Sequence, residues 1–215
     1  MATSADKGPF GARRDGKIAA TLTSGAVGAM AGGLAGLAWG GVGGRIAMRV
    51  LLLTSPDYVR GLVSDDGFEM GRFSPDTIAL LILTAILGGL AGFLYGLIRM
   101  VLRGPQWVIA IGLGIALAAG VGGGVIVNAE GNDFRLLKPL WLAVSMFMVI
   151  PGAWGVTVVL LTERLLQPSA LFPKLPARIN ERYWGATGSA FGWMVLAAMA
   201  GLGITDLVRD VAKLT

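Results

Sequence analysis

Residues 18–53 of this chain read IAATLTSGAVGAMAGGLAGLAWGGVGGRIAMRVLLL, and this stretch decides the fold class. It has no charged residue before Arg45. A helix needs about 20 apolar residues to cross a bilayer, so the stretch predicts a membrane-spanning helix. The span covers residues 18–42, and it continues to residue 53 if the glycines around Gly40 and Gly44 do not break the helix. We favour the continuous helix.

The same stretch carries a regular series of small residues. Glycine occupies every fourth position, at Gly28, Gly32, Gly36, Gly40 and Gly44. Residues four apart share one face of a helix. In lipid, such small faces let two helix backbones approach closely. The ladder therefore predicts a helix-packing face, which contacts either other helices of the same bundle, the more common arrangement, or another subunit.

Shorter ladders of the same kind recur further along the chain. They comprise Gly88, Gly92 and Gly96; Gly120 and Gly124; and Gly188 and Gly192. We expect these glycines also to lie at contacts between helices or at an interface with a partner.

Four further apolar stretches follow, at residues 77–101, 107–127, 140–161 and 185–204. The chain is 54% hydrophobic and 14% charged, whereas a soluble domain is roughly 25% charged. Together these features predict an all-α polytopic membrane protein with about five spans and glycine-mediated helix packing. We expect one bundle over residues 18–209, a flexible arm over 1–17 and a tail over 205–215.

The basic residues suggest how the chain is oriented. Slightly more than half of the 18 Lys and Arg residues fall on the N-terminal side of the predicted membrane. Because short cytoplasmic loops are enriched in Lys and Arg, this bias favours a cytoplasmic N-terminus and an outer C-terminus. We expect a multi-pass protein of a bacterial-type plasma membrane. The basic residues are scattered and form no stripe, so no nucleic-acid partner is expected.

Several kinds of chemistry are missing. The chain has no Cys and no His, which excludes thiol catalysis, disulfides and any mechanism with a His base. No ionisable residue lies near the middle of a predicted span, whereas ion-coupled carriers usually have one there. We therefore predict no catalytic residue, no cofactor and no enzymatic activity.

Acidic residues gather in the two predicted outer loops. Asp65, Asp66 and Glu69 lie in the first, and Glu130 and Asp133 lie in the second. Carboxylates bind hard divalent cations, which makes these five residues weak candidates for a metal site. We favour turns instead, with Asp65, Asp66 and Glu69 forming a salt-bridge network with Arg45 and Arg49 on the outer face, and predict no bound metal.

Three functions are compatible with this pattern. The leading hypothesis is a non-enzymatic accessory or structural subunit that packs through its glycine faces in a membrane complex or a homo-oligomer. The second is a small transporter or channel that uses the outer acidic loops as a vestibule, with a helix kink at Pro151. The third and weakest is a metal-dependent enzyme acting on lipid or envelope precursors.

Overall fold

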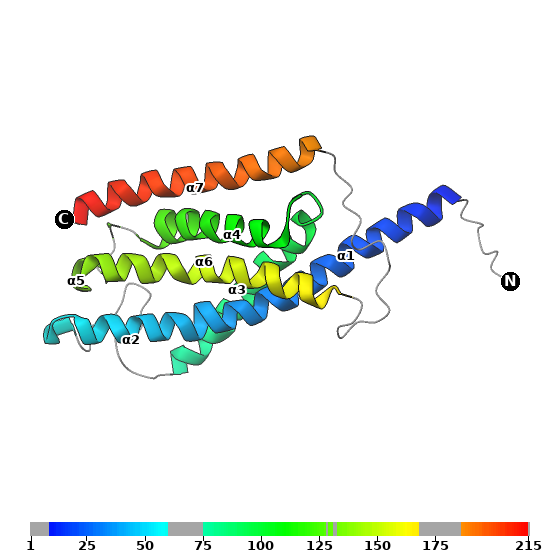
Figure 1. The fold of residues 1–215 in the computed structure, drawn as a ribbon. Helices are drawn as coiled ribbons and strands as arrows, with labels where there is room; N and C mark the ends of the chain where they lie inside the picture. Colours follow the sequence, from blue (N-terminus) through cyan, green and yellow to red (C-terminus); the bar gives the residue numbers. More distant parts are fainter. Residues whose placement is uncertain (1–8, 60–74, 128, 131–132, 168–185, 215) are drawn as a thin grey trace.

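The structure is a computed structural model, and it describes residues 9–59, 75–127, 129–130, 133–167 and 186–214. All elements in these ranges are helical (Figure 1). In chain order they are α1 (Pro9–Ala35), η1 (Gly36–Gly43), α2 (Gly44–Thr54), η2 (Asp57–Val59), α3 (Pro75–Ile98), α4 (Gln106–Leu117), η3 (Ala118–Ile126), α5 (Asp133–Leu136), α6 (Leu140–Leu165) and α7 (Ala186–Leu214).

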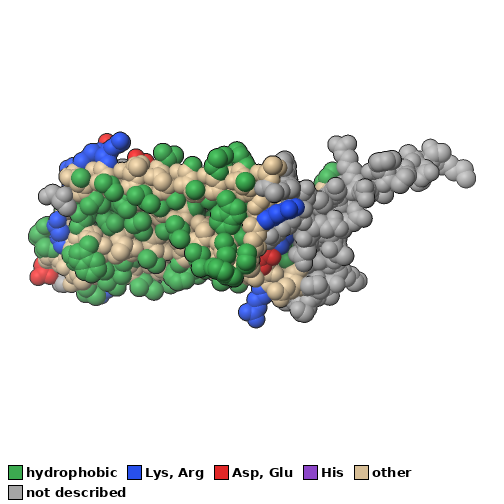
Figure 2. Space-filling model, turned by 45° about the horizontal axis from the view of Figure 1, so that its top comes forward, with side chains coloured by type: hydrophobic (Ala, Val, Ile, Leu, Met, Phe, Trp, Pro, Cys, Tyr) green, Lys and Arg blue, Asp and Glu red, His purple; other side chains and the backbone are tan. Residues whose placement is uncertain are grey.

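Within the described residues, five stretches of helix are long and apolar enough to cross a membrane, which confirms the predicted number of spans. They are Ile18–Thr54, Thr77–Ile98, Gln106–Ile126, Leu140–Leu165 and Thr187–Leu214. Figure 2 shows hydrophobic side chains along the flank of the bundle and charged side chains gathered at its two ends. This distribution suits a molecule whose flank lies in hydrocarbon and whose ends lie in water.

The spanning helices alternate in direction, so the two termini lie at opposite ends of the bundle (Figure 1). We call the end where α1 enters the N-end and the end where α7 finishes the C-end. α1 packs along α3, α4 packs along α6, and α7 packs along η3. The helix α6 also contacts α1, η1 and η3, so it lies at the centre of the arrangement.

The first span is one continuous helix through the glycine-rich region. Ala35, Gly43 and Gly44, at the junctions of α1, η1 and α2, all have right-handed helical dihedral angles. The span Ile18–Thr54 has 37 residues, about 55 Å at 1.5 Å per residue, against a hydrocarbon thickness of about 30 Å. The helix therefore crosses the bundle at a tilt and extends beyond it at the N-end (Figure 1).

Two segments of the spans are π-helical, which the sequence analysis did not anticipate. η1 reads GLAWGGVG and η3 reads AAGVGGGVI. A π-helix is rare because its wider turn packs its own backbone less well. Glycine lowers the steric cost of this conformation, and both segments gain contacts with neighbouring helices, α3 and α6 for η1 and α6 and α7 for η3.

Helix boundaries differ from the predicted ones at the two chain ends. The predicted arm is helical from Pro9 onward, and the predicted tail is helical as far as Leu214. Proline is favoured in the first turn of a helix, and Ala, Arg and Lys after it are good helix formers. At the other end, Asp206 pairs with Arg209 and Asp210 pairs with Lys213, which supports the helix after it leaves the apolar region.

The turns between spans contain residues suited to them. Gly104 has a φ of +149°, a conformation that side chains disfavour, and Pro105 follows as the N-cap of α4. A buried cluster of Leu51, Val59, Val127, Phe134 and Leu137 closes the C-end of the bundle. The turns are therefore part of the packed structure at both ends.

Candidate functional site

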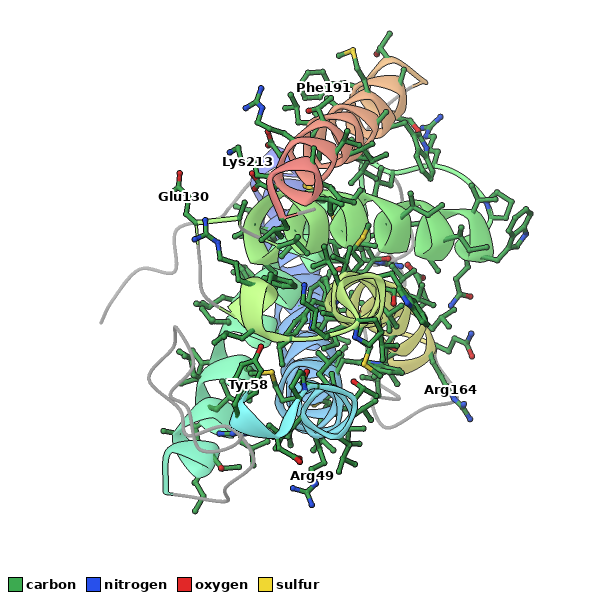
Figure 3. All side chains as sticks on the ribbon, turned by 90° about the vertical axis from the view of Figure 1, so that its left-hand side faces the viewer. Arg49, Tyr58, Glu130, Arg164, Phe191 and Lys213 are labelled. Atoms are coloured by element: carbon green, nitrogen blue, oxygen red, sulfur yellow. The ribbon has the colours of Figure 1, made fainter. Side chains whose placement is uncertain are left out.

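The junction between the first glycine ladder and α2 is the first site that the sequence predicts. Arg45 is half-buried and Arg49 is exposed, and both lie on α2. Figure 3 shows Arg49 pointing away from the bundle at the C-end. Asp65, Asp66 and Glu69, the predicted partners of these arginines, lie outside the described residues, so the salt-bridge network stays a prediction.

The second outer loop is described only in part. Glu130 is exposed at the C-end (Figure 3). Asp133 is the first residue of α5, and its side chain lies outside the description. Within the described ranges, no group of three or more acidic side chains is close enough together to hold a metal ion.

The glycines of α1 and α3 lie opposite one another within the chain. A Cβ atom added to Gly28 would overlap the carbonyl oxygen of Gly92, and one added to Gly32 would overlap that of Gly88. The glycines of α3 are equally close to α1, since a Cβ added to Gly96 would overlap the carbonyl oxygen of Ser24. Side chains at these positions would force the two backbones apart.

The close contact between the first glycine ladder and the backbone of α3 ends toward the C-end. A Cβ at Gly36 would overlap the carbonyl of Thr84, and one at Gly40 would lie 3.1 Å from the Thr84 Cβ. A Cβ at Gly44 would meet nothing within 4 Å. The ladder is therefore covered by α3 from Gly28 to Gly40 and open at Gly44.

The other predicted glycines lie around η3 and α7. A Cβ at Gly120 would lie 2.6 Å from Met199 Cγ, and one at Gly124 would lie 3.1 Å from Gly203 Cα. A Cβ at Gly192 would lie 3.0 Å from a methyl group of Leu102. Gly188 is partly buried on α7.

Glycines outside the predicted ladders make equally close contacts around α6. A Cβ at Gly122 would lie 2.7 Å from Met148 Cα and 3.2 Å from the carbonyl oxygen of Phe147. Pro151 has no N–H group to donate to that carbonyl within α6. The helix α6 continues through Pro151, and the backbone of η3 packs at the position where its hydrogen-bond ladder is interrupted.

An ion pair joins α3 to α6 at the N-end. Arg99 Nε donates to Glu163 Oε1 over 2.9 Å, and Arg99 Nη2 donates to Glu163 Oε2 over 2.7 Å. The Arg99 side chain is 6% exposed and that of Glu163 is 19% exposed. Two parallel charge-assisted bonds in a largely water-free position make this a strong polar contact.

Hydrogen bonds from α1 lie close to this ion pair in the fold. The Ser24 hydroxyl donates to the carbonyl of Gly96 over 2.8 Å, one turn before Arg99 on α3. Ser24 is fully buried. The polar groups at the N-end therefore connect α1, α3 and α6 to one another.

Two tryptophans tie α6 and the first span together deeper in the bundle. The Trp154 indole donates to the carbonyl of Gly32 over 3.0 Å, and the Trp39 indole donates to the Thr157 hydroxyl over 2.9 Å. Trp154 is half-buried and Trp39 is 37% exposed, and in hydrocarbon an N–H group without such a partner is costly. These bonds fix the register between α6 and the glycine face of the first span.

The contact between Arg99 and Glu163 was not predicted from the sequence. The two residues are 64 positions apart. A signal was nevertheless present, because the two residues carry opposite charges and each lies near the end of a predicted span, Arg99 within residues 77–101 and Glu163 just after residues 140–161. Opposite charges at neighbouring span ends are natural partners.

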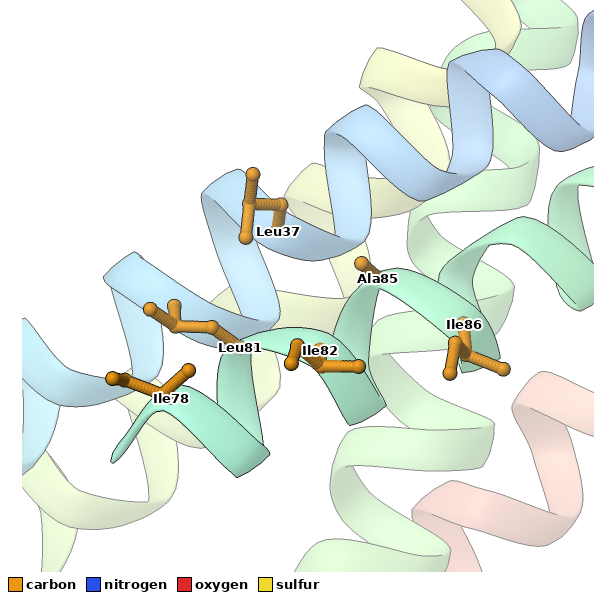
Figure 4. Close-up of a pocket in the computed structure, with 6 residues that line it drawn as sticks. All are labelled: Leu37, Ile78, Leu81, Ile82, Ala85 and Ile86. Carbon is orange, nitrogen blue, oxygen red and sulfur yellow. The ribbon is translucent and has the colours of Figure 1, made fainter. Parts of the chain in front are cut away.

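An open apolar groove lies on the flank of the bundle between η1 and α3 (Figure 4). Its volume is about 350 Å³. The groove is lined by Leu37, Ile78, Leu81, Ile82, Ala85 and Ile86.

Comparison with known proteins gives no relative to this chain: no protein-family model matches it, and neither a curated protein nor a solved structure is similar enough to count as a match. What this multi-pass, all-helical protein does must therefore be argued from its own geometry.

Proposed function

We propose that this protein is a non-enzymatic accessory subunit of a membrane complex or of a homo-oligomer, and that α7 provides the contact surface. The observation that carries the proposal is the composition of the outward face of α7. This face carries a row of small residues among larger side chains, whereas the outward face of α3 consists mostly of large aliphatic residues.

The helix α7 is packed on one face only. Trp193, Met199, Gly203 and Leu207 contact α4 and η3. The opposite face is exposed, and it carries the small residues Ala197, Ala198, Gly201 and Thr205 together with the larger Met194, Leu202 and Ile204. A Cβ added at Gly201 would meet nothing within 4 Å. Ala197, Gly201 and Thr205 are spaced four apart, the spacing that permits close approach of a second helix in lipid.

The outward face of α3 provides the comparison. Its exposed large residues are Ile78, Ile82, Leu83, Ile86, Leu87, Leu90, Leu94 and Ile98, and its exposed small residues are Ala79 and Ala91. Such a surface fills space well against mobile acyl chains. A row of small residues packs less well against lipid tails than large side chains do, but it lets another helix approach closely enough for backbone contact. This difference supports α7 as the helix that contacts a partner.

We further infer that the ladders of α1 and α3 serve the bundle itself. Their closest neighbours are each other, so they are not available to a second protein from Gly28 to Gly40. In this proposal the internal ladders and the tryptophan bonds make a rigid support, and α7 is attached to it as the contact helix. We also keep the assignment to a bacterial-type plasma membrane with a cytoplasmic N-terminus.

Solubilisation of the native membrane in a mild detergent, followed by size analysis and identification of what co-purifies, tests the proposal. We expect a stable assembly with a second copy or another membrane protein. Gly201→Leu should abolish this assembly because the added side chain separates the two helices. Gly44→Leu is the matched control, since it adds the same bulk at another open position.

A wild-type protein that runs as a lone monomer in mild detergent and in lipid nanodiscs would refute the proposal. An assembly that survives Gly201→Leu as well as it survives Gly44→Leu would refute the role of α7.

A further inference from the structure

We propose that the apolar groove between η1 and α3 binds an acyl chain of an anionic phospholipid, and that Arg49 binds the phosphate of the same lipid. This site is independent of the proposed contact surface on α7. The proposed site consists of the groove and of Arg49, an exposed arginine that comes after Leu37 in the first span.

The groove has the chemistry of an acyl-chain site. All six of its lining residues are apolar, and its volume of about 350 Å³ is in the range of small-ligand sites, about 300–1,000 Å³. Leu37 forms one wall, and isoleucines of α3 form the other (Figure 4). Ala85, the smallest of the six lining residues, forms the floor, and a Cβ added to Gly33 of the first span would lie 3.4 Å from its carbonyl oxygen.

The position of the groove limits what can occupy it. Ile78 is 61% exposed, Ile82 is 56% exposed and Ile86 is 55% exposed, and all three lie within the span Thr77–Ile98. At this depth the surroundings are hydrocarbon, so the natural occupant is a lipid tail. Ile78 lies at the C-end of the span and Ile86 lies deeper, which directs the tail inward from the C-end interface.

Arg49 lies where the phosphate of that lipid is expected. Leu37, Gly41, Arg45 and Arg49 follow one another at four-residue spacing on the first span. Arg49 is about 18 Å from Leu37 along the helix axis at 1.5 Å per residue. One leaflet of hydrocarbon is about 15 Å thick, half of the core. A lipid with its tail beside Leu37 therefore has its phosphate at about the level of Arg49.

Arg49 also has the chemistry and the exposure that the phosphate requires. Its guanidinium is exposed and points away from the bundle (Figure 3). Arginine binds phosphate oxygens through paired N–H donors. The extra negative charge of an anionic headgroup favours such a lipid over a zwitterionic one by about fivefold per basic residue. The proposal assigns no role to Arg45.

Native mass spectrometry of the purified protein tests the site with two lipids, phosphatidylglycerol and phosphatidylcholine, that carry identical palmitoyl and oleoyl chains. We expect phosphatidylglycerol to bind about fivefold more tightly. Arg49→Gln should remove this preference. Arg209→Gln is the matched control, since Arg209 is also exposed near the C-end but lies on α7, and it should leave the preference unchanged.

A second set of variants tests whether the groove binds the acyl chain, independently of the charge of Arg49. Ala85→Leu fills the floor and should weaken both lipids while keeping their ratio. Ala91→Leu, at an exposed position of α3 outside the groove, should leave both affinities unchanged. Leu37→Ala removes a wall without adding volume and should also weaken both lipids, which covers the case in which Ala85→Leu does not fold.

Three results would overturn the proposal. The first is equal affinity of the wild-type protein for the two lipids. The second is an equal loss of the lipid preference in Arg49→Gln and Arg209→Gln, which would indicate that anionic lipids are attracted by any positive charge on the protein. The third is undiminished binding by Ala85→Leu or, if that variant is unfolded, by Leu37→Ala.

Discussion

A buried ion pair between two single side chains lies at the N-end of the bundle. Arg99 is the more deeply buried member of its pair with Glu163, at 6% against 19% exposure. A buried charge is tolerated because its partner is present, and it is costly once that partner is removed. The contribution of the pair is therefore best measured by comparing single and double substitutions.

Glu163→Gln should lower the free energy of unfolding by about 3 kcal/mol, because it leaves the Arg99 guanidinium buried without a carboxylate. The double variant Arg99→Met with Glu163→Met should recover most of that loss. Denaturant-induced unfolding in mixed micelles, followed by circular dichroism, measures both.

Lys213→Gln provides the control for the ion pair. It removes an i,i+3 pair with Asp210 in which Lys213 is 53% exposed, and it should cost less than about 1 kcal/mol. If Glu163→Gln were as mild as Lys213→Gln, the Arg99–Glu163 pair would not be a structural anchor.

Among the helices, α1 and α3 approach most closely where both lack side chains. Some glycines are therefore covered by another helix and others are not, and the sequence alone does not distinguish the two kinds. Gly32 faces the backbone of α3, whereas Gly201 on α7 faces open space, although both belong to small-residue series.

Gly32→Ala should destabilise the bundle by about 1–3 kcal/mol, because the new methyl overlaps the carbonyl of Gly88 and the helices must separate. Gly201→Ala should be neutral or stabilise by up to about 1 kcal/mol, since alanine is the better helix former and has room. Thermal unfolding of the two variants in the same detergent measures the difference. Equal melting temperatures would contradict the close approach of α1 to α3.

At the scale of the whole molecule, an odd number of spans places the two termini on opposite sides of the membrane. The chain has no Cys, so single cysteines can be introduced without removing native ones. Lys7→Cys should react with a membrane-impermeant maleimide only after the cells are permeabilised, and Lys213→Cys should react in intact cells.

The two cysteine variants separate the number of spans from their orientation. Labelling of both positions from the same side would contradict five crossings. Labelling in the reverse pattern would leave the five crossings intact and overturn the cytoplasmic assignment of the N-terminus.

The all-helical membrane class and the number of spans could be predicted from the amino-acid sequence alone. Hydropathy is a local property that sums along the chain, and the bilayer supplies a fixed length against which each stretch is measured. For that reason the predicted spans match the helices to within a few residues at most of their ends. The larger differences are at the two chain ends, where the α-helix begins at Pro9 and continues to Leu214, beyond the apolar stretches that hydropathy reports.

Which face of each helix is covered by another helix could be learned only from the three-dimensional structure. Whether a glycine such as Gly32 or Gly201 is covered depends on residues far away in the chain, and the spacing of small residues is the same in both cases. The pairing of Arg99 with Glu163, the bond from Trp154 to Gly32 and the groove beside Leu37 likewise arise from helices that are distant in sequence. Periodicity fixes the face of a helix on which a residue lies, and packing alone fixes what that face meets.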